Sequence, residues 1–306
     1  MSVHVPDSFR RSLATRPPDA PGDPDGDTWL DRLPRLVDDH LERWDLTVDG
    51  DPWHGHNALV VPVRRGRERA ALKLTWPHPE ARHEHLALRL WDGDGAVRLL
   101  AADPAAYALL LERLDGDRDL TTVPFLDACE VIGGLFGRLD RPATPQLGTL
   151  EGRAVRWREQ LAEATPLVPR RFTEQALAAL PDLLDDAPAP RLVHEDLHDL
   201  NVLAPLDPAR GDWLAIDPKP VAGEWAYAVA PVVWNRPDEL ARAHNLRAHA
   251  QLRAAVVGEA AGLDPERVRA WTFVRLVLNA VDAAAHAPAG DEFRSRMIAL
   301  AKAFAD

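Results

Sequence analysis

Three polar side chains in the second half of the chain have types and spacing suited to chemistry. Asn201 follows Asp196 by five residues, and Asp217 ends the apolar run 213–216. Carboxylate and amide oxygens are ligands that Mg²⁺ accepts in proteins, and phosphoryl transfer depends mainly on positioning and charge neutralisation. We therefore expect Asp196 to orient an acceptor hydroxyl for attack on a phosphate, and Asn201 and Asp217 to bind Mg²⁺.

The spacing of these residues is that of a kinase catalytic loop. The pattern H-x-D-x-x-x-x-N runs from His194 to Asn201, and an aspartate ends the next expected strand. Ordinary surface turns also gather acidic and amide residues, and 207–212 is expected to be only a turn. The apolar residues beside the loop, 192–193 and 202–204, favour short strands that hold it at a rigid edge.

A lysine inside an apolar strand is the candidate phosphate contact. Lys73 interrupts the run 70–74 and matches the V-A-I-K strand of kinases, whose lysine pairs with phosphates and with a helix glutamate. Glu84, on the next expected helix, is the first choice of partner and Glu80 the second. An edge-strand lysine reaching water would produce the same residues, so this alternative stays open.

Two backbone segments are expected to contact the nucleotide. Gly55 lies in the loop 50–57, which lacks a full G-x-G-x-x-G, and is the expected position of close approach to phosphate oxygens. Glu112 and Leu114 fit an inter-lobe hinge whose carbonyl and amide read adenine. A strand end followed by a turn predicts the same residues. Because G-x-x-x-x-G-K-[ST] is absent from the sequence, a P-loop fold is disfavoured.

The hydrophobic pattern predicts an α+β protein with strands before helices. A helix at 28–44, capped by Asp27 and broken near Pro34, should precede five strands and one inserted helix: 46–48, 58–63, 70–74, helix 79–91, 96–101 and 106–112. Later helices are expected at 126–139, 153–164, 173–184, 238–262 and 265–287. The expected domains are a polar, partly disordered segment 1–27, a small nucleotide-binding lobe 28–114 and a helical large lobe 115–306 with the catalytic loop and acceptor site.

Composition narrows the class of partner. The net charge of -12 argues against nucleic-acid and anionic-membrane binding and is compatible with a cationic small molecule. The lone cysteine, Cys129, excludes an internal disulfide and suits a reducing cytoplasm. Neither a secretory signal nor a membrane-spanning run is visible, so a cytoplasmic location is expected. The pairs His54/His56 and His83/His85 lack the further ligands of a metal site.

With these residues in place, the chain resembles the aminoglycoside phosphotransferases, and within them the streptomycin 6-kinase and hydroxyurea-resistance kinase group. The resemblance runs from Trp29 to about Asn235 and rests on three segments: LRLWDGDGAVRLL at 88–100, LLERL at 110–114 and AIDPKP at 215–220. It implies a protein-kinase-like two-lobed fold, ATP with Mg²⁺, and a small-molecule hydroxyl acceptor on a cyclitol or aminoglycoside. Asp196, Asn201 and Asp217 match the family's catalytic and metal positions.

One position departs from the related kinases, which read G-E-P-A-Y-D-L where this chain reads GEWAYAV at 223–229. Ala228 replaces the acid that braces the catalytic loop in those kinases, and a water molecule or Glu224 could compensate for it. The leading hypothesis is an ATP-dependent phosphotransferase acting on a hydroxyl of a small cationic antibiotic of the streptomycin type. A kinase for another polyol, sugar or amino alcohol, and a catalytically weak nucleotide-binding protein, are the alternatives.

Overall fold

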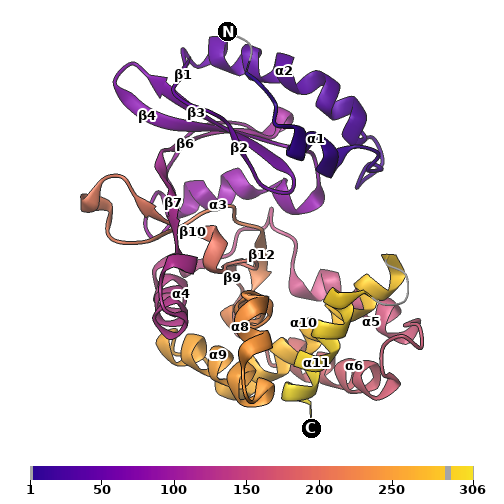
Figure 1. The fold of residues 1–306 in the computed structure, drawn as a ribbon. Helices are drawn as coiled ribbons and strands as arrows, with labels where there is room; N and C mark the ends of the chain where they lie inside the picture. Colours follow the sequence, from indigo (N-terminus) through magenta and orange to yellow (C-terminus); the bar gives the residue numbers. More distant parts are fainter. Residues whose placement is uncertain (1–2, 287–290, 306) are drawn as a thin grey trace. The chain divides into compact units, whose positions relative to one another are not determined.

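The computed structural model describes residues 3–286 and 291–305. The chain forms two compact units (Figure 1): unit one is Met1–Gly116 with Ala204–Pro218, and unit two is Asp117–Leu203 with Lys219–Asp306. The chain crosses from one unit to the other within strands β7 (Leu114–Asp119) and β10 (Val202–Pro205) and again before Lys219. The first crossing lies near the expected boundary at 114, whereas the segment 204–218, expected in the large lobe, belongs to unit one.

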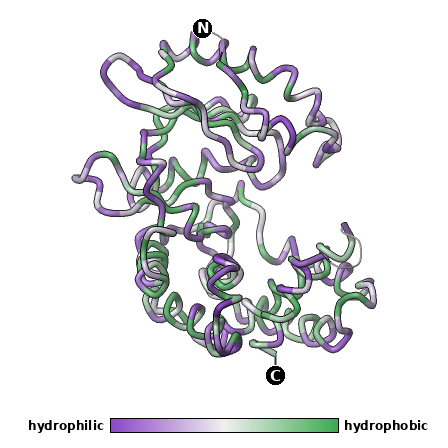
Figure 2. Tube along the Cα trace, viewed as in Figure 1, coloured by the Kyte–Doolittle hydropathy of each residue, from purple (hydrophilic) through white to green (hydrophobic). Residues whose placement is uncertain are grey.

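Unit one is built on an antiparallel sheet in the order β1-β3-β4-β6-β5, with β2 also pairing β3. Its strands are β1 (Thr47–Val48), β2 (Trp53–His54), β3 (Ala58–Arg65), β4 (Glu68–Thr75), β5 (Leu99–Asp103) and β6 (Ala108–Glu112). Figure 2 shows the central strands largely in green and the turn between β3 and β4 in purple. Because side chains alternate between the faces of a strand, Leu72 and Leu74 lie on the opposite face from Lys73.

Helices cover both faces of this sheet. Figure 1 shows α1 (Asp7–Leu13) and α2 (Gly26–Arg43) on one side and α3 (Glu84–Trp91) on the other. The first face holds a core of side chains from both helices and from strands β3, β4 and β6. Asp25, not the expected Asp27, caps α2 by accepting a hydrogen bond from the Thr28 amide at 2.7 Å. The helix continues through Pro34 without the expected break.

Within the segment 1–27, expected to be polar and partly disordered, Asp7–Leu13 form α1 and residues 14–25 form neither helix nor strand; Met1 and Ser2 lie outside the described residues. Phe9 of α1 is fully buried in the core of unit one. The Oγ of Ser8 and the Nε2 of His54 are hydrogen-bonded at 2.7 Å, and Arg16 donates to the Asn57 side chain at 2.7 Å. These contacts attach the N-terminal segment to the loop that precedes β3.

Unit two is mostly helical. Its α-helices are α4 (Phe125–Leu139), α5 (Leu150–Ala162), α6 (Arg170–Asp185), α7 (Ala230–Trp234), α8 (Pro237–Arg242), α9 (Leu246–Ala260), α10 (Pro265–His286) and α11 (Glu292–Phe304). A small antiparallel sheet, in the order β12-β9-β8, carries the catalytic-loop segment; its strands are β8 (Arg141–Pro142), β9 (Arg191–His194) and β12 (Pro220–Gly223). α10 packs against α5, α6, α9 and α11, which explains the long apolar run in its sequence.

Several element boundaries differ from those expected. The expected helix 79–91 is a short 3₁₀ helix, η1 (Pro79–Ala81), followed by α3. The expected helix 238–262 is divided into α8 and α9, because Asn245 caps a new helix through the Ala248 amide. The remaining 3₁₀ helices are η2 (Pro104–Ala106), η3 (Leu120–Thr122), η4 (Asp199–Asn201), η5 (Pro208–Arg210) and η6 (Trp225–Val229). The expected end of α10 at Ala287 lies outside the described residues. Among the described helices, none combines the length and apolar character needed to cross a bilayer.

Candidate active site

Lys73 is buried on the second face of the unit-one sheet. It lies at the centre of β4, opposite Val60 of β3 and Leu109 of β6, and only 5% of its surface is exposed. Its ammonium group donates to Glu84 Oε1 at 2.7 Å and also to Asp217 Oδ1. Burial would lower the pKa of this ammonium, but the charges of Asp217 and Glu84 outweigh it and raise the pKa. Lys73 is therefore a central-strand cation held between two carboxylates, not an edge-strand lysine reaching water.

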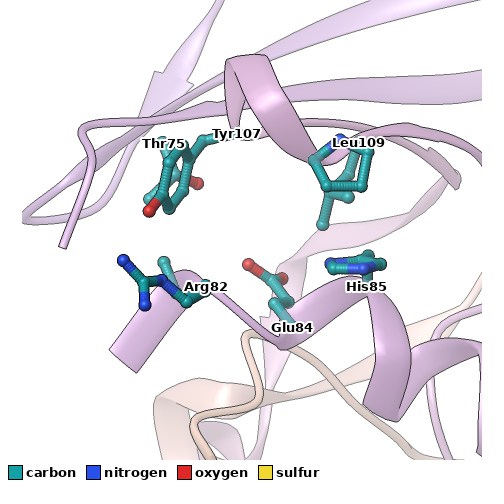
Figure 3. A pocket seen from close by; sticks show the side chains of 8 residues that line it. Thr75, Arg82, Glu84, His85, Tyr107 and Leu109 are labelled. Atoms are coloured by element: carbon teal, nitrogen blue, oxygen red, sulfur yellow. The ribbon is translucent and has the colours of Figure 1, made fainter. Parts of the chain in front are cut away.

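Glu84 begins α3 and is also buried. Burial raises the pKa of its carboxyl group to about 7, despite the opposing effect of Lys73. In Figure 3 its carboxylate faces a small pocket that is also lined by Thr75, Arg82 and Tyr107. The pocket has a volume of about 10 Å³, enough for one water molecule. The pocket is too small for a nucleotide. It lies next to the ion pair of Lys73 and Glu84, because Glu84 is one of its lining residues.

Asp217 belongs to unit one and lies two residues after the end of β11 (Leu214–Ala215). Its backbone adopts φ of 53°, the left-handed region, which aspartate tolerates better than most residues. The carboxylate reaches Lys73. Unit one thus brings together Lys73, Glu84 and Asp217, three of the residues expected to contact nucleotide or metal.

The remaining expected nucleotide contacts also lie in unit one. The Gly55 amide donates to the Ala58 carbonyl at 3.0 Å, and a Cβ at Gly55 would meet no atom within 4 Å. In the same loop, Gly50 has φ of 143°, so Gly50 is the glycine that the backbone conformation requires. Glu112 ends β6 and buried Leu114 begins β7, as expected of a strand leading into a connecting segment.

Unit two carries the catalytic-loop residues between β9 and β10. The fully buried His194 accepts a hydrogen bond at Nδ1 from the Asp196 amide at 3.2 Å. The amide nitrogen of Asn201 donates to the Asp196 carbonyl at 2.8 Å and lies 3.2 Å from His198 Nε2. Because the side-chain nitrogen bonds the loop, the side-chain oxygen is the atom that Asn201 can offer as an acceptor or ligand. The loop thus orients both Asp196 and Asn201.

Lys219 is the side chain that contacts Asp196, a role the sequence reasoning missed. Its Nζ lies 2.7 Å from Asp196 Oδ2, and its carbonyl accepts from the Glu195 amide at 3.1 Å. Burial would raise the pKa of Asp196, but the Lys219 charge, with help from His198 and His194, holds the pKa below its ordinary value. Asp196 is therefore an ionised carboxylate at neutral pH, which is the form that the expected role of orienting a hydroxyl requires.

Arginines brace this loop. Arg153 of α5 makes a two-bond pair with the buried Glu195 carboxylate, with Nη2 to Oε1 at 2.8 Å. Arg275 of α10 donates to the Glu195 carbonyl at 2.8 Å and to the Tyr227 carbonyl at 3.2 Å. Arg236 pairs with buried Asp199 at 2.8 Å. Charged donors to carbonyls and carboxylates are among the stronger hydrogen bonds in proteins.

These contacts bear on Ala228, which is fully buried. Glu224, one of the two substitutes considered for the missing acid, is engaged elsewhere, because its carboxylate accepts from Arg267 and from the Trp271 indole. The loop is instead held by arginines that bond its carbonyl and carboxylate oxygens. Arg275 lies within an apolar helix sequence and Arg236 lies between helices α7 and α8, so neither had a motif that could reveal its partner.

Mg²⁺ fits the donor chemistry of the expected residues. Within residues 3–286 and 291–305, no group of three or more His, Cys, Asp and Glu side chains could hold a metal by itself. Mg²⁺ does not require such a cage, because it commonly binds one or two protein oxygens together with substrate phosphates and water. The carboxylate of Asp217 and the side-chain oxygen of Asn201 are donors of the kind that Mg²⁺ accepts.

Comparison with known proteins places this chemistry in a family. The family model for aminoglycoside/hydroxyurea antibiotic resistance kinases matches residues 43–286. The streptomycin 6-kinase of Streptomyces glaucescens is 38% identical over 265 residues, which cover 84% of this chain and 85% of that protein. The hydroxyurea phosphotransferase of Kitasatospora aureofaciens is 41% identical over 264 residues, 83% of this chain and 74% of that protein.

Solved structures share the fold at low sequence identity. Aminoglycoside phosphotransferase APH(4)-Ia superposes with a TM-score of 0.59 at 16% identity, over 89% of this chain and 99% of that chain. A choline/ethanolamine kinase family protein from Mesorhizobium loti gives 0.61 at 15% identity, over 88% and 94%. The predicted α+β, protein-kinase-like fold and the predicted family resemblance are both confirmed. The chain belongs to the aminoglycoside/hydroxyurea antibiotic resistance kinase family.

Proposed function

We propose that this protein is an ATP-dependent phosphotransferase that phosphorylates a hydroxyl of a small cationic antibiotic of the streptomycin type. The observation that carries the proposal is Asp196: an ionised carboxylate on a loop that also orients Asn201. Identities of 38% and 36% to two streptomycin 6-kinases support the choice of acceptor. The net charge of -12 favours approach of a cation.

In this proposal unit one is the nucleotide-binding lobe. Lys73 contacts the phosphates, Glu84 holds Lys73 in place, and the loop with Gly55 covers the phosphates. The backbone of Glu112 and Leu114 reads adenine. The burial of Lys73 between two carboxylates supports this assignment, since a buried charge with two charged partners is costly to maintain for structure alone.

Unit two is then the large lobe with the acceptor site. Asp196 orients the acceptor hydroxyl and takes its proton as the oxygen attacks the γ-phosphorus; the bond from that phosphorus to the β–γ bridging oxygen breaks, and ADP leaves. Lys219, which contacts Asp196, keeps the carboxylate ionised before the acceptor binds. Asn201 and Asp217 would hold Mg²⁺, which when bound supplies positive charge to the phosphate oxygens.

Hydroxyurea is the second candidate acceptor. Its support is the 41% identity to a hydroxyurea phosphotransferase, although the matched region covers less of that protein than of the streptomycin 6-kinase. The two acceptors differ in size and charge, so the acceptor site must differ between them. A kinase for another polyol, sugar or amino alcohol would share the machinery around Asp196 and differ only in the acceptor that it uses.

The experiment measures ADP release from Mg-ATP with streptomycin, hydroxyurea, other aminoglycosides, sugars and amino alcohols. Asp196→Asn removes the carboxylate with little change in shape, and Asp182→Asn, on an exposed part of α6, is the matched control. Streptomycin-dependent release by the wild type and the control, lost in Asp196→Asn, is the expected result. Release only with hydroxyurea or another aminoglycoside would replace streptomycin as the acceptor. Release only with a sugar or amino alcohol would overturn the antibiotic assignment and keep the mechanism, whereas nucleotide binding without release for any acceptor would favour a nucleotide-binding protein.

A further inference from the structure

The segment 207–212 was expected to be only a surface turn, but it contains an arginine, Arg210, whose side chain is held by several hydrogen bonds. Arg210, the last residue of η5, forms a two-bond pair with Glu112: Nε to Oε2 at 3.1 Å and Nη2 to Oε1 at 2.7 Å. Nη2 also donates to the carbonyls of Gly93 at 2.7 Å and Ala96 at 3.1 Å. Both members of the ion pair are largely buried, at 16% and 18% exposed.

The acceptors of Arg210 come from the segment 91–98, whose sequence WDGDGAVR is part of the subgroup signature. Gly93 has φ of 81°, and a Cβ there would lie 3.0 Å from Arg210 Nη2. Glycine is therefore needed both for the backbone conformation and for the close approach of the guanidinium. Arg98 fastens the same turn to Glu112, because its amide donates to Oε1 at 2.7 Å and its carbonyl accepts from the Glu112 amide at 2.9 Å.

The same turn also pairs with the strand that leads to Asp217. The Ala215 amide donates to the Gly95 carbonyl at 2.9 Å, and the Val97 amide donates to the Ala215 carbonyl at 2.9 Å. Asp217 follows Ala215 by two residues and contacts Lys73. A continuous set of hydrogen bonds therefore connects Glu112, Arg210, the turn 91–98 and β11, all within unit one.

We propose that Arg210 is a positioning residue for Asp217: it clamps the turn 91–98 to Glu112, so that β11 is held at the place where Asp217 meets Lys73 and the metal. The inference rests on the proposed function, because it assumes that Asp217 is a metal ligand. A guanidinium suits this position because its planar fork can bond a carboxylate and two carbonyls together, which an ammonium group cannot do in the same geometry.

A purely structural clamp would change stability alone, so the test needs a readout at Asp217. Arg210→Met removes the charge and the fork, and Arg210→Lys keeps the charge and loses the fork. Arg65→Met, which removes an exposed pair with Glu68 in the same unit, is the matched control. Hydrogen exchange of peptides covering 91–98 and 213–217, and binding of ADP with Mn²⁺ by calorimetry, need neither turnover nor an acceptor.

Arg210→Met should raise hydrogen exchange at 213–217 by about tenfold or more. It should weaken metal-dependent ADP binding about tenfold, while metal-free ADP binding changes less than about twofold. Arg210→Lys should give values between those of Arg210→Met and the wild type. Lower thermal stability with unchanged exchange at 213–217 and unchanged metal dependence would overturn the proposal. If Arg210→Met does not fold, Arg210→Lys decides by the same two measurements. Absence of acceptor turnover in the wild type would contradict the proposed function alone, because neither measurement requires turnover.

Discussion

Replacing Arg275 by methionine tests whether arginines brace the catalytic loop in place of an acid at position 228. The substitution removes two hydrogen bonds to the carbonyls of Glu195 and Tyr227, and the cation–π contact with the Tyr227 ring, whose centroid lies 4.3 Å from the guanidinium. Each charged hydrogen bond contributes roughly 1.5–3 kcal/mol and the ring contact about 1 kcal/mol. Together these contributions amount to about 4–7 kcal/mol as an upper limit; because methionine adds apolar contacts and water can solvate part of the freed carbonyls, the free energy of unfolding should fall by about 2–4 kcal/mol.

The effect on catalysis should exceed the effect on nucleotide binding. Glu195 immediately precedes Asp196, so a loosened Glu195 carbonyl displaces the carboxylate, and a displacement of about 1 Å can lower a rate about 100-fold. We expect kcat to fall about 10- to 100-fold, while ADP binding changes less than about twofold, because the proposed nucleotide contacts lie mainly in unit one. Urea unfolding, steady-state kinetics and calorimetry with ADP measure the three quantities.

Arg269→Met is the matched control, since Arg269 lies on the exposed part of the same helix and bonds the Ala305 carbonyl. It should leave kcat within about twofold of the wild type. Exchange of the loop peptide 192–203 should rise in Arg275→Met and not in Arg269→Met. A normal kcat and normal loop exchange in Arg275→Met would refute the idea that this arginine braces the loop.

Three further results are expected. Gly133→Ala should destabilise the protein by about 1–3 kcal/mol in thermal or urea unfolding, because the new Cβ would lie 2.6 Å from the Ala260 Cβ. Gly134→Ala in the same helix, with open space around it, should stabilise the protein by about 0.5–1 kcal/mol. Equal effects of the two substitutions would contradict the packing described. Cys129 is buried, and burial raises the pKa of its thiol to about 12, so iodoacetamide should not label the native protein at pH 8 and should label it in urea; rapid native labelling would contradict this burial. Arg16→Met should raise hydrogen exchange of the loop 50–57 through loss of the Asn57 contact, and exposed Arg11→Met should not; equal exchange in both would show that the Arg16–Asn57 contact does not hold the loop.

The parts of the fold that depend on local signals were predictable from sequence. The apolar runs 58–63 and 70–74 identified two strands of the sheet, and the spacing of His194, Asp196 and Asn201 identified the loop between β9 and β10. The pairing of Lys73 with Glu84 followed from the kinase pattern, because Glu84 lies on α3, the first α-helix after the strand that carries Lys73. These features need only short-range periodicity and a motif.

Contacts between residues that lie far apart in the sequence were not predictable. Arg210 and Glu112 are 98 positions apart, and the turn that contains Arg210 has the composition of any surface turn. The helix α1 near the start of the chain was not predicted either, because it is held by burial of Phe9 in the core of unit one. Likewise, the donation from Arg275 to the Glu195 carbonyl exists only because α10 packs beside the loop, which periodicity does not reveal.

The most direct test of the central claim is the transfer of labelled γ-phosphoryl from ATP to streptomycin and to hydroxyurea in a single turnover, with wild-type protein and Asp196→Asn. We predict a phosphorylated streptomycin product from the wild type and a rate at least about 100-fold lower for Asp196→Asn, because the carboxylate that takes the hydroxyl proton is gone. Equal rates for the two proteins would contradict the role of Asp196, and a wild-type enzyme that labels neither antibiotic would contradict the proposed acceptor class.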